Sequence, residues 1–221
     1  MSLTRPVGIL GGTFDPVHNG HLRLAIELVD QLGLAEMRLI PSARPPHRGE
    51  PAASPGQRAK WLRVAIAEQP GLRLDDRELL RDGPSYSVDT LVGLRAELPD
   101  TPLCLVMGMD VFAGLPDWHE WQRLFDYAHI LLVARPGTDE ALPAAAQAVL
   151  DARLQPHAAA LGQSLAGAIV RCEPPPLAIS ASRIRSLLAA GRSPRFLLPD
   201  VVLADILDAD VYRQQQPADC A

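Results

Sequence analysis

Short apolar runs alternate with amphipathic segments along the whole chain, and this alternation predicts strands that alternate with helices. In the amphipathic segments the apolar residues lie three or four apart, as at Leu22, Ala25, Ile26 and Val29, so that one face of a helix would be buried. The runs that predict strands cover residues 7–10, 37–40, 72–75, 103–107, 130–134 and 168–172. The patterns that predict helices cover residues 22–32, a segment from 54 onward, 87–98, 118–125, 140–165, 180–190 and 198–207.

Several of these helices carry recognisable end signals. Gly33 follows the first helical pattern, where a glycine commonly ends a helix. Ser54 and Gln57 are spaced as in a capping box, with a proline directly after the serine. Asp117 and Glu120 have the same spacing, which predicts a second capping box at the start of a short helix.

Strands and helices in this order predict the α/β fold class, a doubly wound, mostly parallel sheet flanked by helices. No repeat and no linker interrupts the chain, so residues 1–221 are expected to form a single domain, with a C-terminal helical part over 177–212. Ligands of such sheets bind beyond the carboxyl ends of the strands.

Composition limits the kind of partner and the compartment. The net charge of −5 and the pI near 5.7 argue against a surface for nucleic acid or for a membrane. The sequence has no transmembrane run and no signal peptide, which predicts a cytoplasmic protein. Cys104, Cys172 and Cys220 are widely spaced, and the first two lie in predicted strands, so they are expected to be buried thiols in a reducing compartment.

The basic residues also restrict the chemistry. Lys60 is the one lysine of the chain, and the Gly-Lys pair of a Walker A loop is absent. Any phosphate would therefore be met by histidine and arginine.

The stretch GGTFDPVHNGH, residues 11–21, has the composition of a phosphate site. Gly11 and Gly12 allow a sharp turn and a close approach of a ligand, and the helix that follows Gly20 presents free N–H groups to an anion. His18 and His21, three apart, would point to the same side. Two other interpretations remain open: half of a metal site, or two structural histidines.

The stretch ISASRIR, residues 179–185, places two hydroxyls and an arginine at the start of a second helix. Ser180 is a candidate N-cap, Ser182 lies in the first turn, and Arg185 lies one turn further along, where its planar fork could reach a phosphate. An ordinary capped helix with a surface arginine is the alternative. Asp110 and Arg135 each follow a predicted strand. Asp110 could contact a ribose or cap a helix. Arg135 could contact a phosphate or be a solvated side chain.

Together these stretches resemble a known superfamily. GGTFDPVHNGH resembles the signature of the nucleotidyltransferases with an HxGH motif, and ISASRIR resembles their C-terminal ISSTxxR motif, with alanine at position 181 where the family has serine. Within that superfamily the chain most resembles the bacterial nicotinate-nucleotide adenylyltransferase family. The segments PPHR (45–48), SYSVDTL (85–91), GMDVFAGLPDW (108–118) and ARPG (134–137) extend the resemblance over nearly the whole length.

The resemblance implies a Rossmann-like nucleotidyltransferase fold and adenylyl transfer from ATP to nicotinate mononucleotide, which yields deamido-NAD and pyrophosphate in NAD biosynthesis. Mg2+ would be carried with ATP, and no metal site of the protein itself is expected. The implied catalytic residues are His18, His21 and Arg185. The implied ATP-binding residues are Gly11, Gly12, Thr13, Phe14, Asp110, Arg135, Ile179, Ser180 and Ser182. The implied mononucleotide-binding residues are His47, Arg48, Tyr86, Ser87 and Trp118. Trp118 would stack on the pyridine ring, whereas Trp121 is expected to pack in the core.

Three alternatives remain at the level of the sequence. Nicotinamide mononucleotide or phosphopantetheine could be the acceptor in the same chemistry, although the phosphopantetheine family carries threonine at the position of His18. A regulatory protein that binds nucleotides without turnover is the third, and intact His18, His21 and Arg185 argue against it. Whether the protein is a monomer or a homodimer stays open.

Overall fold

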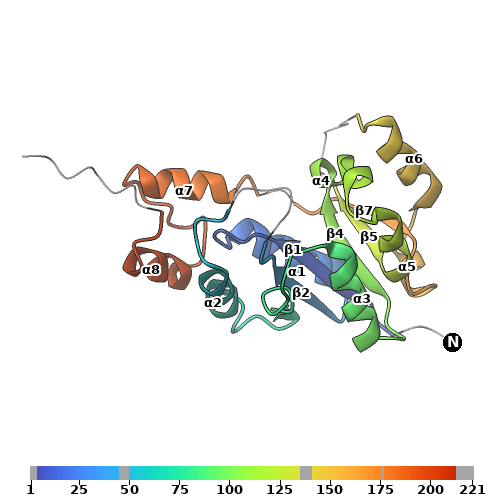
Figure 1. Ribbon diagram of the computed structural model, residues 1–221, viewed down its shortest axis with the longest axis horizontal. Coiled ribbons are helices and arrows are strands. Elements are labelled where there is room, and N and C mark those ends of the chain that lie inside the picture. Colours follow the sequence, from blue (N-terminus) through green and yellow to red (C-terminus); the bar gives the residue numbers. More distant parts are fainter. Residues whose placement is uncertain (1–3, 45–49, 135–140, 176, 213–221) are drawn as a thin grey trace, which may run out of the picture.

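The described strands form one parallel sheet in the computed structural model, which describes residues 4–44, 50–134, 141–175 and 177–212 (Figure 1). The seven strands of this part of the chain lie in the order β3-β2-β1-β4-β5-β7-β6, and every adjacent pair is parallel. Their bounds are β1 Val7–Gly12, β2 Glu36–Pro41, β3 Leu72–Leu74, β4 Leu103–Gly108, β5 His129–Val133, β6 Leu154–Gln155 and β7 Ile169–Cys172. The predicted doubly wound parallel sheet is confirmed.

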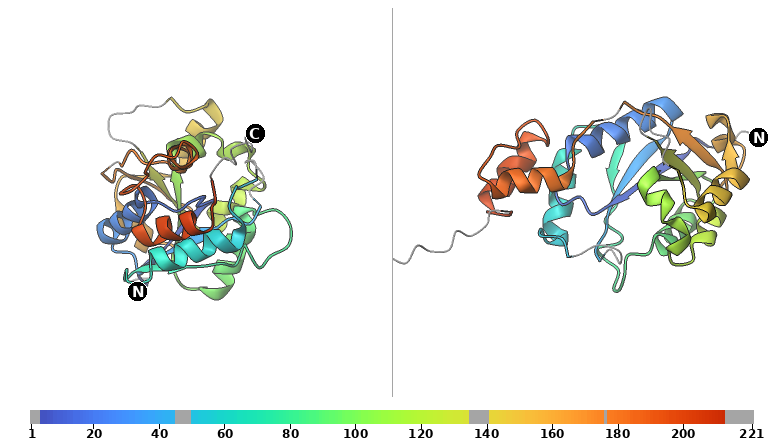
Figure 2. Two further views of the ribbon diagram at one scale, coloured as in Figure 1. Left: turned by 90° about the vertical axis from the view of Figure 1, so that its left-hand side faces the viewer. Right: turned by 90° about the horizontal axis from the view of Figure 1, so that it is seen from above.

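Helices cover both faces of the sheet. One apolar layer includes side chains of α1 (Asn19–Leu32), α2 (Pro55–Ala65), α7 (Ala181–Ala189) and α8 (Asp200–Asp208). The opposite layer includes those of α3 (Ser87–Glu97), α4 (Met109–Ala113), α5 (Leu124–Tyr127) and α6 (Ala144–Arg153). Helices α7 and α8 lie together with α2 at one end of the molecule (Figures 1 and 2).

The central strands are apolar on both sides because both sides are covered. In β1 the side chain of Ile9 belongs to the layer of α3, whereas that of Leu10 belongs to the layer of α1. Leu105 and Val106 of β4 divide in the same way. Consecutive side chains of these continuous apolar runs thus pack in opposite layers.

The local end signals hold for the first two helices. Gly33 follows α1 in the left-handed conformation, with φ of 61°. Ser54 caps α2, and the reciprocal bonds of the capping box with Gln57 are present. Gly11 and Gly12, expected at a turn, instead complete β1, and the chain turns after them.

The prediction of a second capping box, at Asp117 and Glu120, is wrong. Asp117 ends a 3-10 turn, η1 (Leu115–Asp117), and Trp118 after it is extended. Glu120 has a φ of 48° and precedes a second turn, η2 (Trp121–Arg123), before α5 begins. The extended tryptophan interrupts the segment, so no continuous helix forms over 118–125.

The prediction of a single helix over 140–165 is also wrong. Helix α6 ends at Arg153, the short strand β6 follows, and the 3-10 turn η3 covers Ala158–Gly162. Pro156 explains the break, because a proline disfavours helical backbone at the residue before it. Within the described ranges, no helix combines the length and apolarity needed to cross a bilayer.

Candidate active site

The sheet has its topological switch point between β1 and β4, and the site lies there. Helix α1, after β1, packs on one face of the sheet, and α4, after β4, packs on the other, so a crevice opens between the two strand ends. A cleft of about 820 Å3 occupies this position. Every described residue that the sequence predicts for the site lines it: Gly11, Gly12, Thr13, Phe14, His18, His21, Tyr86, Ser87, Asp110, Trp118, Ile179, Ser180, Ser182 and Arg185. His47, Arg48 and Arg135 lie outside the described residues.

The two imidazoles of the first motif are stacked. The ring centroids of His18 and His21 are 3.6 Å apart at an interplanar angle of 18°, so both point to the same side, as the spacing predicts. His18 is the N-cap of α1, and its Nδ1 accepts the backbone N–H of His21 at 3.4 Å. A Cβ at Gly20 would lie 3.0 Å from that Nδ1, so a glycine leaves room for the His18 ring.

His18 is neutral at neutral pH. Burial lowers its pKa from 6.5 to about 4, because the charged form would lose its hydration. A neutral ring whose Nδ1 accepts a hydrogen bond carries its proton on Nε2. The ring of His18 therefore caps α1 through Nδ1 and offers its Nε2–H as a donor.

Asp15 anchors the loop between β1 and α1. Its side chain accepts the N–H groups of Ala52 and Ala53 at 3.0 and 3.1 Å, and the hydroxyl of Tyr212 at 2.5 Å. Burial and the bond to Asp15 raise the pKa of Tyr212, which holds its proton. Asp15 is only 6% exposed, and its carboxylate is held by these three partners. Among the described residues, no group of three or more His, Cys, Asp and Glu could hold an ion.

Arg58, on α2, supports the loop between β1 and α1 and is a residue that the sequence analysis did not identify. The residue is 0% exposed, and its Nη1 donates to the carbonyls of Thr13 and Ser42 at 2.7 and 2.8 Å. The guanidinium thereby holds the loop after β1 against the segment after β2. Its position on the inner face of α2 gives no local sign of this role.

The second motif reaches the first through Arg185. Ser180 caps α7 by accepting the N–H of Arg183, as predicted. From α7 the guanidinium of Arg185 donates to the carbonyl of Asp15 at 2.7 Å and to the hydroxyl of Ser182 at 3.4 Å. The arginine thus lines the same cleft as the imidazoles and is held against the loop between β1 and α1.

The opposite side of the cleft is built from α3, α4 and the segment 118–119. Tyr86 is the N-cap residue of α3, and its ring lies 4.3 Å from that of His119, a residue that the sequence analysis did not identify. Gly108 is the N-cap of α4, so the interpretation of Asp110 as the capping residue is wrong, and its carboxylate lines the cleft from the first turn. Trp121 makes an edge contact with Phe125 but is only partly buried, and Trp118 packs against the same apolar layer, so the expected distinction between a core Trp121 and a cleft Trp118 is not seen in their burial.

A parallel sheet with a cleft at its switch point, a helix N-terminus and paired imidazoles is the arrangement of a Rossmann-like protein that binds a nucleotide. Residues 9–187 match the model of the cytidylyltransferase-like family. Relatives named probable nicotinate-nucleotide adenylyltransferase are 52% identical in Aeromonas salmonicida (strain A449), over 96% of this chain and 97% of theirs, and 50% identical in Pseudomonas entomophila (strain L48), over 95% of each. The chain therefore belongs to the cytidylyltransferase-like family, among the nicotinate-nucleotide adenylyltransferases.

Solved structures agree on the fold. The nicotinic acid mononucleotide adenylyltransferase of Plasmodium falciparum, complexed with NaAD, superposes with a TM-score of 0.73 at 14% sequence identity. The alignment covers 95% of this chain and 98% of that one. The same enzyme complexed with APC gives a TM-score of 0.71. The arrangement of the sheet and helices is thus shared although few residues are.

Proposed function

We propose that the chain transfers the adenylyl group of ATP to nicotinate mononucleotide, which forms deamido-NAD and releases pyrophosphate. The observation that carries the proposal is the meeting of His18, His21 and Arg185, from two segments far apart in the sequence, in one cleft at the switch point. The names of the relatives support the same reaction.

The chemistry needs position and charge more than a protein nucleophile. A phosphate oxygen of the mononucleotide attacks the α-phosphorus of ATP, and the bond from that phosphorus to the oxygen of the β-phosphate breaks. The electron pair leaves with pyrophosphate. Binding both anions in line and stabilising the leaving group are therefore the tasks of the protein.

The two motifs divide these tasks. His18 and His21 lie at the N-terminus of α1, where N–H groups and the positive end of the helix dipole favour phosphate. Arg185 can exchange its bond to the Asp15 carbonyl for a bidentate contact with the leaving phosphates. A phosphate beside His18 would raise the pKa of the ring from its low value, so binding favours an extra proton on the imidazole.

The donor set of the cleft fits magnesium carried by the triphosphate. The described residues build no cage of three or more ligands, and Asp110 offers a single carboxylate from α4. Magnesium bound to the triphosphate would neutralise part of the phosphate charge. His18, His21 and Arg185 would then stabilise the remainder.

The acceptor would occupy the side of the cleft formed by Tyr86, Ser87 and Trp118. The N-terminal turn of α3 presents backbone N–H groups there, which suit a carboxylate better than an amide with its own N–H groups. Trp118 supplies an aromatic surface for the pyridine ring.

Pyrophosphate release from magnesium-ATP tests the proposal, with nicotinate mononucleotide, nicotinamide mononucleotide and phosphopantetheine offered in separate reactions. Preference for the nicotinate acceptor is expected. Preference for another acceptor would refute the assignment of the acceptor side and leave the chemistry of the two motifs intact. ATP binding without turnover of any acceptor would indicate a regulatory protein.

Substitution of the imidazoles tests their role. His18→Ala and His21→Ala are each expected to lower kcat by about 10²- to 10³-fold, the effect of losing one preorganised donor. The matched control is His157→Ala, since that histidine is exposed and lies outside the cleft. Unchanged turnover in the two cleft variants would contradict the mechanism.

A further inference from the structure

Glu78 is a buried acid at the acceptor side of the cleft that the proposed mechanism does not use. It lies on the loop between β3 and α3, is 8% exposed, and lines the cleft together with Ser85, Tyr86 and Ser87. It also borders a separate cavity of about 20 Å3 behind the end of β1, large enough for one water molecule. A carboxyl in such a place needs partners, because an unpaired buried acid is strongly destabilising.

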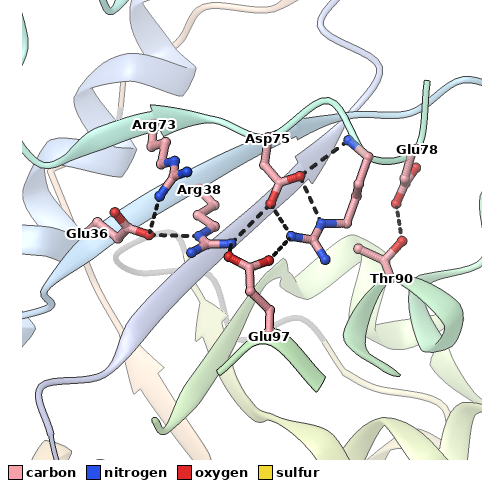
Figure 3. Close-up of polar contacts among 8 residues, drawn as sticks. Glu36, Arg38, Arg73, Asp75, Glu78, Thr90 and Glu97 are labelled. Atoms are coloured by element: carbon pink, nitrogen blue, oxygen red, sulfur yellow. Dashed lines mark hydrogen bonds and ion pairs between the residues drawn. The ribbon is translucent and has the colours of Figure 1, made fainter. Parts of the chain in front are cut away.

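The first partner is the hydroxyl of Thr90, which donates to Glu78 Oε1 at 2.6 Å (Figure 3). Thr90 is itself buried and lies in the first turn of α3. The bond therefore fixes the start of the helix whose N-cap residue is Tyr86. Figure 3 shows this pair beside, but separate from, the ion-pair network that joins Arg38, Asp75 and Glu97.

Ser85, directly before Tyr86, lies near enough to Glu78 for its hydroxyl to lower the pKa of the acid. The oxygen of Ser85 accepts the backbone N–H groups of Ala43 and Arg44 at 3.0 and 3.3 Å, and its own proton stays available as a donor. The N–H of Ser85 in turn donates to the carbonyl of Arg44 at 3.1 Å. Glu78 thus joins the segment after β2, the approach to α3 and the first turn of α3.

Glu78 ionises less readily than an exposed glutamate, chiefly because it is buried. Burial raises its pKa, with a further contribution from Asp75, and this outweighs the opposing effects of the hydroxyls of Thr90 and Ser85 and of the guanidinium of Arg81. An ionised carboxyl here would repel an acceptor that carries its own carboxylate, whereas a neutral one would not.

We propose that Glu78 is the positioning residue that shapes the acceptor subsite for an acidic pyridine mononucleotide. This inference rests on the proposed function. Glu78 holds Ser85 and Thr90 so that the backbone N–H groups at the start of α3 face the acceptor carboxylate. It acts through these two residues and makes no bond to the reacting atoms.

Two variants of Glu78 and one control test the role. Glu78→Gln keeps an oxygen that accepts from both hydroxyls, and Glu78→Ala removes it. Asp82→Ala is the control, because it removes an exposed carboxylate from the same loop outside the cleft. KM for nicotinate mononucleotide, KM for ATP, kcat and the thermal midpoint are measured for each protein.

The alanine variant is expected to raise KM for the acceptor about tenfold, the effect of losing the hydrogen bonds that hold the segment, with KM for ATP unchanged. The glutamine variant and the control are expected to keep the wild-type KM values. An unchanged acceptor KM in the alanine variant would overturn the proposal. So would a parallel rise of both KM values, since that indicates a general structural role.

The acceptor that the wild type uses distinguishes a failure of the proposed function from a failure of the positioning role of Glu78. If the wild type fails to use nicotinate mononucleotide, the proposed function fails, and the same variants are compared on the mononucleotide that it does use. A specific rise of the acceptor KM that glutamine prevents still supports the positioning role, whereas its absence refutes it.

Discussion

The low pKa of His18 predicts a stability that depends on pH, and His18→Asn isolates this contribution. Asparagine is a favoured N-cap residue, so the variant keeps an acceptor for the start of α1 and loses the titrating group. The unfolded chain takes up a proton at His18 as the pH falls through 6.5, whereas the folded chain does so only near pH 4. Its contribution to the free energy of unfolding is therefore complete above pH 6.5 and is lost as the pH falls toward 4.

The size of the effect follows from the same two pKa values. Between neutral pH and about pH 5, the wild type is expected to lose about 2 kcal/mol more than the variant. His129, whose pKa burial also lowers, is present in both proteins and cancels in the comparison.

Urea denaturation, followed by far-UV circular dichroism at several pH values, measures the difference. The two proteins should diverge steadily as the pH falls below 6.5, with equal m-values. Parallel curves for wild type and His18→Asn would refute the reasoning, because they would mean that the His18 ring is protonated in the folded state as readily as in the unfolded chain.

Three further predictions concern other contacts. Tyr212→Phe removes the hydroxyl bonded to the carboxylate of Asp15 and is expected to lower the free energy of unfolding by about 1.5–3 kcal/mol in urea denaturation; no change would show that water replaces the hydroxyl. Ser54→Ala, which breaks the capping box of α2, should cost about 1 kcal/mol in the same assay, and an equal loss in Ser54→Gly would contradict the cap as the cause. Burial raises the pKa values of Cys104 and Cys172 to about 12 and about 11, so both should resist a thiol reagent until guanidinium unfolds the protein. Fast modification of either of these two cysteines in the native protein, located by mass spectrometry, would contradict their burial.

Much of the fold could be predicted from the sequence because its determinants are local. The alternation of strand and helix patterns is set by which face of each segment is buried, and it gives the parallel sheet directly. The caps at Ser54 and Ser180 also depend on residues within one turn. The meeting of the two motifs in one cleft was predictable because each stretch resembles a motif of a known superfamily.

The supports of the site could not be predicted, because they depend on contacts between distant segments. Nothing near Arg58 in the sequence indicates that its guanidinium holds the carbonyls of Thr13 and Ser42. Glu78 likewise meets Thr90 only once the loop before α3 has folded back. The incorrect helix over 140–165 has a different cause: its alanine-rich composition favours a helix, but Pro156 prevents one from continuing.

The bond between Asp15 and Tyr212 joins residues that are 197 positions apart. During synthesis the first motif is therefore made long before the last of these partners of its anchoring carboxylate. Until then Asp15 lacks its hydroxyl donor, and Arg185 has not yet reached its carbonyl. The cleft can reach its final shape only after residues up to Tyr212 have been translated, because Asp15 needs that hydroxyl as a partner.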